Sequence, residues 1–396
     1  MVTHVRNNFC IAPFTQLTFG PNGIYSPCPE IGGRAWKEPS ASPVLMWTSD
    51  DYNVLRESFS NNEKNPVCDR CWGQEEQKNV SLRKRLLTQG GLFKKGELLD
   101  FVNTGYTVGP MQINLMTSNK CNLRCRICRA GSSVTFNTEG RVYEKKLKKK
   151  TIYTSPSTKP TSYSKKQINE IFQLSGNLRR LEFYGGEPLL DKPTIELLEL
   201  LVASGKSKDI ILFYNTNGTV TPTNKQFTLW NQFKSIEFNF SIDDIGDRFT
   251  YNRYPGKWET VLANISLIRS YPWTVDTKFL SICTVSNINV YYLPEILTEL
   301  EKLELPSFLN NVFGPEYYDI AHLPMPIKEQ IIDKLLTYKD VSKIQFVINM
   351  LQSPENLTHW EEFKYWTKGK DAYRKENFAE VCSEYYKVIK KYDQQF

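Results

Sequence analysis

The sequence predicts an α/β protein whose centre is a partial (β/α)6 TIM-like barrel over residues 106–316. Three observations carry this prediction. Six short runs rich in Val, Ile, Phe, Tyr and Leu recur in this part of the chain, and helical patterns separate them. Strands that alternate with helices form βαβ units and parallel sheets. Several unusual polar motifs follow the runs directly, and barrels of this type place their chemistry at the carboxyl ends of the strands.

The six runs are expected to be the barrel strands. They cover residues 111–117, 178–185, 210–217, 235–243, 278–285 and 307–314. Among the helices between them, one follows the candidate N-cap Ser164, and another begins near Asp191 and Pro193 and ends near Gly205. Further helical patterns cover residues 258–270 and 293–303.

Two regions flank the barrel. Residues 1–105 are expected to form a cysteine-rich module. Residues 317–396 are expected to form a helical C-terminal extension, because Ile327, Ile331 and Leu335 repeat at helical spacing. The apolar faces of this extension are expected to pack against the barrel or the N-terminal module, with a partner surface as the alternative.

The positive charge of the 396-residue chain is local. The formal net charge is +7, but residues 141–166 alone hold nine Lys or Arg against one acid, Glu144. This run belongs to a basic insertion over residues 129–166. It is interpreted as a solvated surface loop or as a contact surface for an acidic partner, such as nucleic acid or an electron-donor protein.

The first residues, MVTHVRNNFC, lack the apolar core of a secretory signal, and no apolar run reaches the ~18 residues of a membrane span. A cytoplasmic location is therefore expected. In a reducing compartment, cysteines at short spacings serve more often as metal ligands or catalytic thiols than as disulfides.

Three cysteines form the motif CNLRCRIC, in which Cys121, Cys125 and Cys128 have the spacing C-x3-C-x2-C. The histidines His4, His322 and His359 lie far away in the sequence. A closed structural zinc site needs four ligands, so three thiolates leave one position open on the metal they bind. Thiolates also suit iron–sulfur clusters, and a cluster held by three cysteines has one iron free to bind a small molecule.

Four further cysteines lie in the N-terminal region, at Cys10, Cys28, Cys68 and Cys71. They could complete a four-thiolate site on their own. Cys283 lies in an apolar run and Cys382 lies in an expected helix, and both are interpreted as buried structural thiols.

The barrel strands end in short polar motifs. These motifs are YGGEP (184–188), NTNG (215–218), SIDD (241–244) and, shortly afterwards, NRYPG (252–256). Each alone could be a turn or a helix start. Together they share one rim with the three-cysteine loop, which favours a functional site.

This combination resembles the radical S-adenosylmethionine (SAM) superfamily over about residues 106–316. The resemblance implies that Cys121, Cys125 and Cys128 hold a 4Fe–4S cluster whose open iron binds SAM. The residues that the resemblance assigns to SAM are Gly185, Gly186 and Glu187 near the methionyl amino group, Thr216, Asn217, Ser241 and Asp243 on the ribose and carboxylate sides, and Arg253 on the carboxylate. The residue before the third cysteine is usually aromatic and packs near the adenine; here it is Ile127, which can still cover the base.

The N-terminal region resembles the auxiliary-cluster modules called twitch or SPASM, through FCIAPFTQLTFGPNGIYSPCPE and NPVCDRCWGQE. Here the module precedes the barrel instead of following it. The resemblance implies a second 4Fe–4S cluster on Cys10, Cys28, Cys68 and Cys71, with a structural zinc or a different ligand set as alternatives.

The resemblance also implies an activity. SAM is cleaved reductively to methionine and a 5′-deoxyadenosyl radical, which takes a hydrogen atom from the substrate, and a flavodoxin or ferredoxin is the expected electron donor. A peptide or protein side chain is the expected substrate, because related modules accompany peptide substrates. The alternatives are a nucleotide or nucleic acid substrate, motivated by the basic run, and a non-catalytic zinc-binding module. The sequence identifies no catalytic radical-quenching residue.

Overall fold

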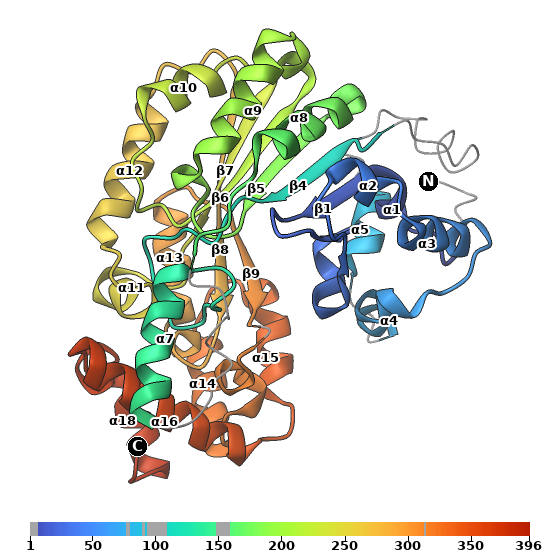
Figure 1. Ribbon diagram of the computed structural model, residues 1–396. Helices are drawn as coiled ribbons and strands as arrows, with labels where there is room; N and C mark the ends of the chain where they lie inside the picture. The colour runs from blue at the N-terminus through green and yellow to red at the C-terminus, as the bar shows by residue number, and fades with distance from the viewer. Residues whose placement is uncertain (1–6, 77–79, 89–91, 93–108, 148–158, 313) are drawn as a thin grey trace.

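The computed structural model describes residues 7–76, 80–88, 92, 109–147, 159–312 and 314–396. Its centre is one nine-stranded sheet with the order β3-β2-β1-β4-β5-β6-β7-β8-β9 (Figure 1). The strands are β1 (Gln16–Phe19), β2 (Ile24–Ser26), β3 (Trp36–Lys37), β4 (Gln112–Met116), β5 (Arg180–Tyr184), β6 (Ile211–Thr216), β7 (Ser235–Ser241), β8 (Asp276–Val285) and β9 (Ser307–Asn311).

Strands β4 to β9 confirm the six predicted barrel strands. Each is parallel to its neighbour, and they stand side by side in chain order. This is the arrangement that right-handed βαβ units produce. The α/β fold class and the six-stranded parallel barrel sheet were therefore predicted correctly.

Helices cover one face of the barrel sheet (Figure 1). They are α8 (Lys165–Leu174), α9 (Lys192–Ala203), α10 (Asn224–Trp230), α11 (Gly246–Asn252), α12 (Trp258–Ser270) and α13 (Leu293–Lys302). The predicted cap of α8 is present as a capping box, in which the Ser164 hydroxyl accepts from the Gln167 backbone N–H and the Gln167 side chain accepts from the Ser164 N–H.

The two faces of the sheet differ in chemistry because successive side chains of a strand point to opposite faces. In β5, Leu181 and Phe183 are fully buried in the main hydrophobic core. The alternate residues Arg180 and Glu182 lie on the other face, where Arg180 pairs with both Glu182 and Glu237. The apolar face thus packs on the helices, and the opposite face carries polar side chains.

The sheet continues into the N-terminal region, which the sequence did not predict. Strand β1 runs parallel to β4, with Gln16 opposite Gln112, and β2 and β3 follow as antiparallel neighbours. The accompanying helices are α1 (Ala12–Thr15), α2 (Pro43–Trp47), α3 (Asp50–Ser60), α4 (Asp69–Glu76) and α5 (Leu82–Thr88). A second hydrophobic core, which includes Phe14, Phe59 and Trp72, lies in this region. The predicted domain boundary at residues 105 and 106 lies outside the described residues.

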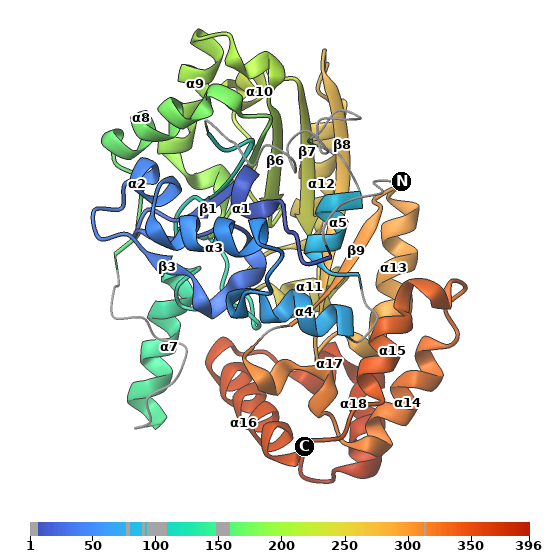
Figure 2. The same ribbon diagram turned by 90° about the vertical axis from the view of Figure 1, so that its right-hand side faces the viewer.

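The C-terminal region is helical, as predicted. Its helices are α14 (Met325–Leu335), α15 (Gln345–Leu351), α16 (Leu357–Arg374), α17 (Phe378–Val381) and α18 (Ser383–Tyr392). Figure 2 shows them gathered at one end of the molecule, below the sheet. Their apolar residues belong to the main core, so the extension packs against the barrel rather than standing apart.

The basic run is not a loop throughout. Its first residues, 141–147, are the end of helix α7 (Val134–Leu147), and Lys165 and Lys166 begin α8. Residues 148–158, which hold Lys148, Lys149 and Lys150, lie outside the described residues. A helix with the length and apolar character to cross a membrane is absent from the described part of the chain.

Candidate functional site

The three predicted cysteine ligands lie on the loop that joins β4 to α7. Two backbone hydrogen bonds fix this loop to the end of α11 and the residues after it: Arg124 N donates to Tyr254 O at 2.6 Å, and Arg126 N donates to Asn252 O at 2.8 Å. All three thiols are free of disulfides. The loop therefore presents them from a backbone that is held in place.

The two glycines of YGGEP let the chain after β5 pass directly against the start of this loop. Gly186 N donates to Ser118 O at 2.6 Å, and Glu187 N donates to Lys120 O at 2.8 Å. A Cβ atom at Gly186 would lie 2.3 Å from Lys120 O, which no real side chain permits. Gly185 has a φ of +128°, a conformation that L side chains rarely adopt. Both positions thus require glycine.

Glu187 is fully buried and joins two predicted motifs. Its Oε1 accepts from the Thr216 hydroxyl at 2.9 Å and from Leu189 N at 3.1 Å, and its Oε2 accepts from Asn217 N at 2.8 Å. Burial raises the pKa of this carboxyl to about 7, although the hydrogen bonds oppose the shift. A positive ligand group beside Glu187 would favour its ionised form.

The Asn217 side chain reaches the cysteine loop. Its Nδ2 donates to Asn122 Oδ1 at 2.9 Å and lies 3.9 Å from Cys121 Sγ. The Asn122 amide in turn donates to the Thr219 hydroxyl at 2.8 Å. Asn122 was missed by the sequence analysis; its only signal was its position inside the motif CNLRCRIC.

Arg253 and Asp243 form the other side of the site. Arg253 Nη2 lies 2.8 Å from Asp243 Oδ2, and its Nη1 lies 4.0 Å from Cys125 Sγ. The Nε atom of Arg253 is buried and has no hydrogen-bond partner among the described residues. Asp243 is held from behind, since its Oδ1 accepts from Thr284 N at 2.9 Å. The guanidinium thus lies beside the thiol with one donor unused.

The remaining two predicted residues occupy the same rim. Ser241 is the last residue of β7 and is half-buried. Ile127 lies between Cys125 and Cys128 and packs, half-buried, against the main core.

The three thiols fit a cluster with three cysteine ligands. Burial raises the pKa of all three, that of Cys128 to about 12, with Cys125 as a further cause at Cys121 and Cys128. Arg253 opposes this rise at Cys125 and Cys128. Three soft donors on one short loop, with the Arg253 cation beside Cys125, suit an anionic iron–sulfur group. In the described part of the chain, no group of three or more His, Cys, Asp or Glu side chains is placed to hold a single metal ion.

The four N-terminal cysteines surround one cavity. Its empty volume is about 360 Å³, including the part that opens to solvent, and apolar side chains such as Ile31, Leu82 and Leu86 complete its wall with Arg70 and Arg83. Burial raises the pKa of the four thiols. Four thiols around an empty space are a donor set that fits a four-thiolate cluster.

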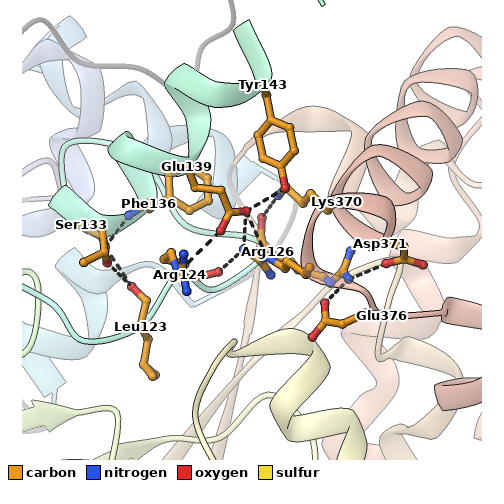
Figure 3. Close-up of polar contacts among 12 residues, drawn as sticks. Leu123, Arg124, Arg126, Ser133, Phe136, Glu139, Tyr143, Lys370, Asp371 and Glu376 are labelled. Carbon is orange, nitrogen blue, oxygen red and sulfur yellow. Dashed lines mark hydrogen bonds and ion pairs between the residues drawn. The ribbon is translucent and has the colours of Figure 1, made fainter. Parts of the chain in front are cut away.

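A network of buried charges behind the cysteine loop was also missed by the sequence analysis (Figure 3). It joins Arg126 of the loop to Lys370 and Asp371 of α16, which lie about 245 residues further along the chain. The only sequence signal was a pair of basic residues, Lys370 and Arg374, one helical turn apart on the buried face of α16.

The barrel and its rim define an α/β enzyme class in which three cysteines follow the first barrel strand. Comparison with known families agrees: residues 115–309, about half of the chain, match the model of the Radical SAM superfamily. Through this region the chain belongs to the Radical SAM superfamily and is an enzyme; the comparisons leave its reaction unspecified. The alternative of a non-catalytic zinc-binding module is set aside.

One curated relative is a radical SAM cyclopropyl synthase, TigE, of Paramaledivibacter caminithermalis, which is 33% identical over 95 residues. The match covers 24% of this chain and 19% of TigE, so this chain spans only about a fifth of the relative's length.

Among solved structures, anSMEcpe with bound AdoMet has 18% identity and a TM-score of 0.41, covering 58% of this chain and 60% of that one. SuiB of Streptococcus suis bound to S-adenosylmethionine has 9% identity and a TM-score of 0.40, covering 89% and 72%.

Proposed function

We propose that this protein cleaves SAM reductively at the Cys121, Cys125 and Cys128 site and takes a hydrogen atom from a peptide or protein side chain. One observation carries the proposal. The cysteine loop, the GGE segment, the end of β6 and the Arg253–Asp243 pair are joined by direct contacts into a single rim.

Each residue of the rim has a role in this proposal. The three thiolates hold a 4Fe–4S cluster, which, when bound, supplies the electron that splits the sulfonium of SAM. Glu187 accepts hydrogen bonds from the SAM ammonium, and Arg253 donates to its carboxylate, for which its Nε is available. The remaining contacts, on the ribose and carboxylate sides of SAM, come from Thr216, Asn217, Ser241 and Asp243, with Ile127 packing near the adenine. The chain itself binds and orients SAM and keeps water away, while the cofactor carries the difficult chemical step.

The N-terminal region is proposed to be a twitch- or SPASM-like module with a second 4Fe–4S cluster on Cys10, Cys28, Cys68 and Cys71. The cavity that these four side chains line supports this assignment. With all four thiolates bound, this cluster has no open iron, so it would transfer electrons or hold structure. A flavodoxin or ferredoxin is the proposed electron donor, and a cytoplasmic location remains a prediction.

The polar face of the barrel sheet favours a peptide over a polyanion as substrate. From the amino ends to the middle of the strands, Arg180 and Lys278 are balanced by Glu182 and Glu237, which pair with them at 2.5–3.1 Å. A nucleic acid needs an excess of positive charge. Towards the carboxyl ends, the amide of Asn239 donates to Asn215 at 2.7 Å, and its buried Oδ1 has no hydrogen-bond partner among the described residues. Carboxamides match the donor and acceptor pattern of a peptide backbone.

The test is anaerobic reconstitution with iron and sulfide, followed by reduction in the presence of SAM. The expected product is 5′-deoxyadenosine, formed by the wild-type chain and absent with Cys125→Ala. Cys382→Ala is the matched control, because Cys382 is fully buried in the main core, away from the rim, and its loss should leave product formation intact. A reconstituted, reduced wild-type chain that releases no 5′-deoxyadenosine would refute the proposed activity.

A second measurement addresses the substrate class. Binding of a nucleic acid would fall steeply with salt, and neutralising Lys145 to Lys150 would remove this salt dependence. We expect substrate binding to be unaffected by these changes; a steep dependence on salt would instead favour a nucleotide or nucleic acid substrate.

A further inference from the structure

The backbone of the cysteine loop is held from two sides. On one side, the N–H groups of Arg124 and Arg126 donate to the 252–254 segment. On the other side, the carbonyls of the same two residues accept from helix α16. Lys370 Nζ donates to Arg126 O at 2.8 Å, and Arg374 Nη2 donates to Arg124 O at 2.6 Å. Both side chains are buried, and burial together with the charges of Arg374 and Arg126 lowers the pKa of Lys370.

The loop also reaches back into the C-terminal region. The Arg126 side chain is fully buried, and its Nη2 lies 2.5 Å from Asp371 Oδ1 and 2.7 Å from Glu376 Oε2. The guanidinium stacks on Tyr251, with 3.5 Å from its central carbon to the ring centroid. Figure 3 shows Arg126 pointing from the loop toward the two acids while Lys370 approaches the loop backbone. The loop and α16 thus exchange charged groups in both directions.

A third residue closes this arrangement. Glu139 of α7 accepts from Arg374 Nε at 3.0 Å and from the Tyr143 hydroxyl at 2.9 Å. It also lies 3.6 Å from the Nε atom of Arg124. The helix that leaves the cysteine loop is therefore tied to the same point of α16 as the loop itself.

We propose that α16 is a positioning element of the three-cysteine site: Lys370 and Arg374 fix the loop backbone between Cys121 and Cys128, and Arg126 locks the loop onto α16. This deepens the proposed function, since it takes the three cysteines as cluster ligands. It also extends the site beyond residues 115–309, the part of the chain that matches the superfamily. The burial of Lys370, Arg374 and Arg126 supports this role, because buried polar groups are costly unless they make hydrogen bonds.

The test uses the full-length chain without cluster and follows hydrogen exchange of the Arg124 and Arg126 amides. Lys370→Met removes a donor to the loop and keeps the length of the side chain. We expect exchange at these amides to become about tenfold faster, the scale of losing one hydrogen bond. Strand β6 serves as the internal reference and should not change.

Two further variants distinguish positioning from general packing. Lys370→Arg keeps a charged donor and should restore the slow exchange. Lys368→Met, an exposed residue of the same helix, should have no effect. Unchanged exchange at Arg124 and Arg126 in Lys370→Met would overturn the proposal.

Faster exchange in β6 would reveal that Lys370→Met unfolds the sheet. In that case the milder Glu376→Gln variant tests whether α16 positions the loop. It weakens one of the two acid contacts of Arg126 and should speed exchange of the loop alone by about threefold. Loop exchange equal to the wild type in this folded variant would refute the proposal.

A further measurement uses the protein with its iron–sulfur cluster bound. After reconstitution, the electron paramagnetic resonance spectrum of the reduced cluster should change with added SAM in the wild type and in Lys370→Arg, and the change should be diminished in Lys370→Met. A spectrum of Lys370→Met that responds to SAM like the wild type would count against positioning. A wild-type chain that binds no cluster would refute the proposed function, while the exchange result on the cluster-free chain would still stand.

Discussion

Arg253 and Asp243 form a buried ion pair at 2.8 Å on the rim of the barrel, and the same guanidinium lies beside Cys125. The pair joins the end of β7 to the segment after α11. The negative charge of Asp243 is thereby balanced by Arg253 before any ligand binds. Arg253 is consequently a fixed part of the protein as well as a candidate partner for a ligand carboxylate.

Removing Arg253 should therefore destabilise the cluster-free protein. Arg253→Met leaves the Asp243 carboxylate buried without its cation, which costs about 3–5 kcal/mol of unfolding free energy. The double variant Arg253→Met with Asp243→Asn should recover much of this loss. Urea denaturation measures both. The control is Lys278→Met, whose partly exposed pair with Glu237 should change stability by less than about 1 kcal/mol. Equal losses in the single and double variants would contradict this account.

Gly186 should not tolerate a methyl group. In Gly186→Ala the new Cβ would meet Lys120 O at 2.3 Å, and this backbone oxygen cannot swing away as a side chain could. We expect a loss of about 2 kcal/mol or more in unfolding free energy and weaker binding of SAM. Gly176→Ala is the matched control, because a Cβ there meets nothing within 4 Å. Urea denaturation and equilibrium binding of SAM check both variants; a Gly186→Ala protein as stable as Gly176→Ala would show that the contact is not limiting.

Glu187 should make stability depend on pH. Its pKa is raised from 4.5 to about 7, so the folded state keeps its proton where the unfolded state loses it. The contribution of Glu187 is fully present below pH 4.5 and is lost as the pH rises through about 7. Relative to Glu187→Gln, the cluster-free wild type should lose about 3 kcal/mol between pH 4.5 and 7.5. Urea titrations at several pH values test this, and parallel pH profiles of the two proteins would disprove it.

The two groups of cysteines should hold separate iron. The reconstituted wild type should bind about eight irons per chain, and Cys125→Ala and Cys71→Ala should each bind about four. Iron and sulfide analysis measures this, with zinc determined on the same samples. Zinc that disappears with Cys71→Ala while iron stays at about four would instead identify a structural zinc in the N-terminal cavity.

The barrel could be predicted from the sequence because its information is local. Strand β5 has Leu181 and Phe183 at alternate positions. Ser164 and Gln167, three residues apart in the sequence, form the capping box of α8. The grouping of the polar motifs on one rim could be predicted from these strands, because the carboxyl ends of parallel strands lie at the same edge of the sheet. The structure also shows that Thr216 and Asn217 donate to Glu187, which no motif indicated.

Other features depend on contacts between distant residues. Strand β1 has only four residues, and its Gln16 and Thr18 face polar partners on β4, so it carries no strong strand pattern. The contact of Arg126 with Asp371 spans 245 positions and involves charged residues that would ordinarily be exposed. No periodicity in the sequence could identify such a pair.

The hydrogen-bonded ladder between β1 and β4 makes the barrel depend on the N-terminal region. Strand β4 leads into the cysteine loop and also pairs with β1. The N-terminal region is therefore not an independent unit that can be removed without affecting the barrel. A deletion that starts the chain after residue 105 would turn β4 into an open edge, the kind of surface on which sheets aggregate. Excision of this region would therefore harm the proposed SAM cleavage even if its own cysteines had no part in it.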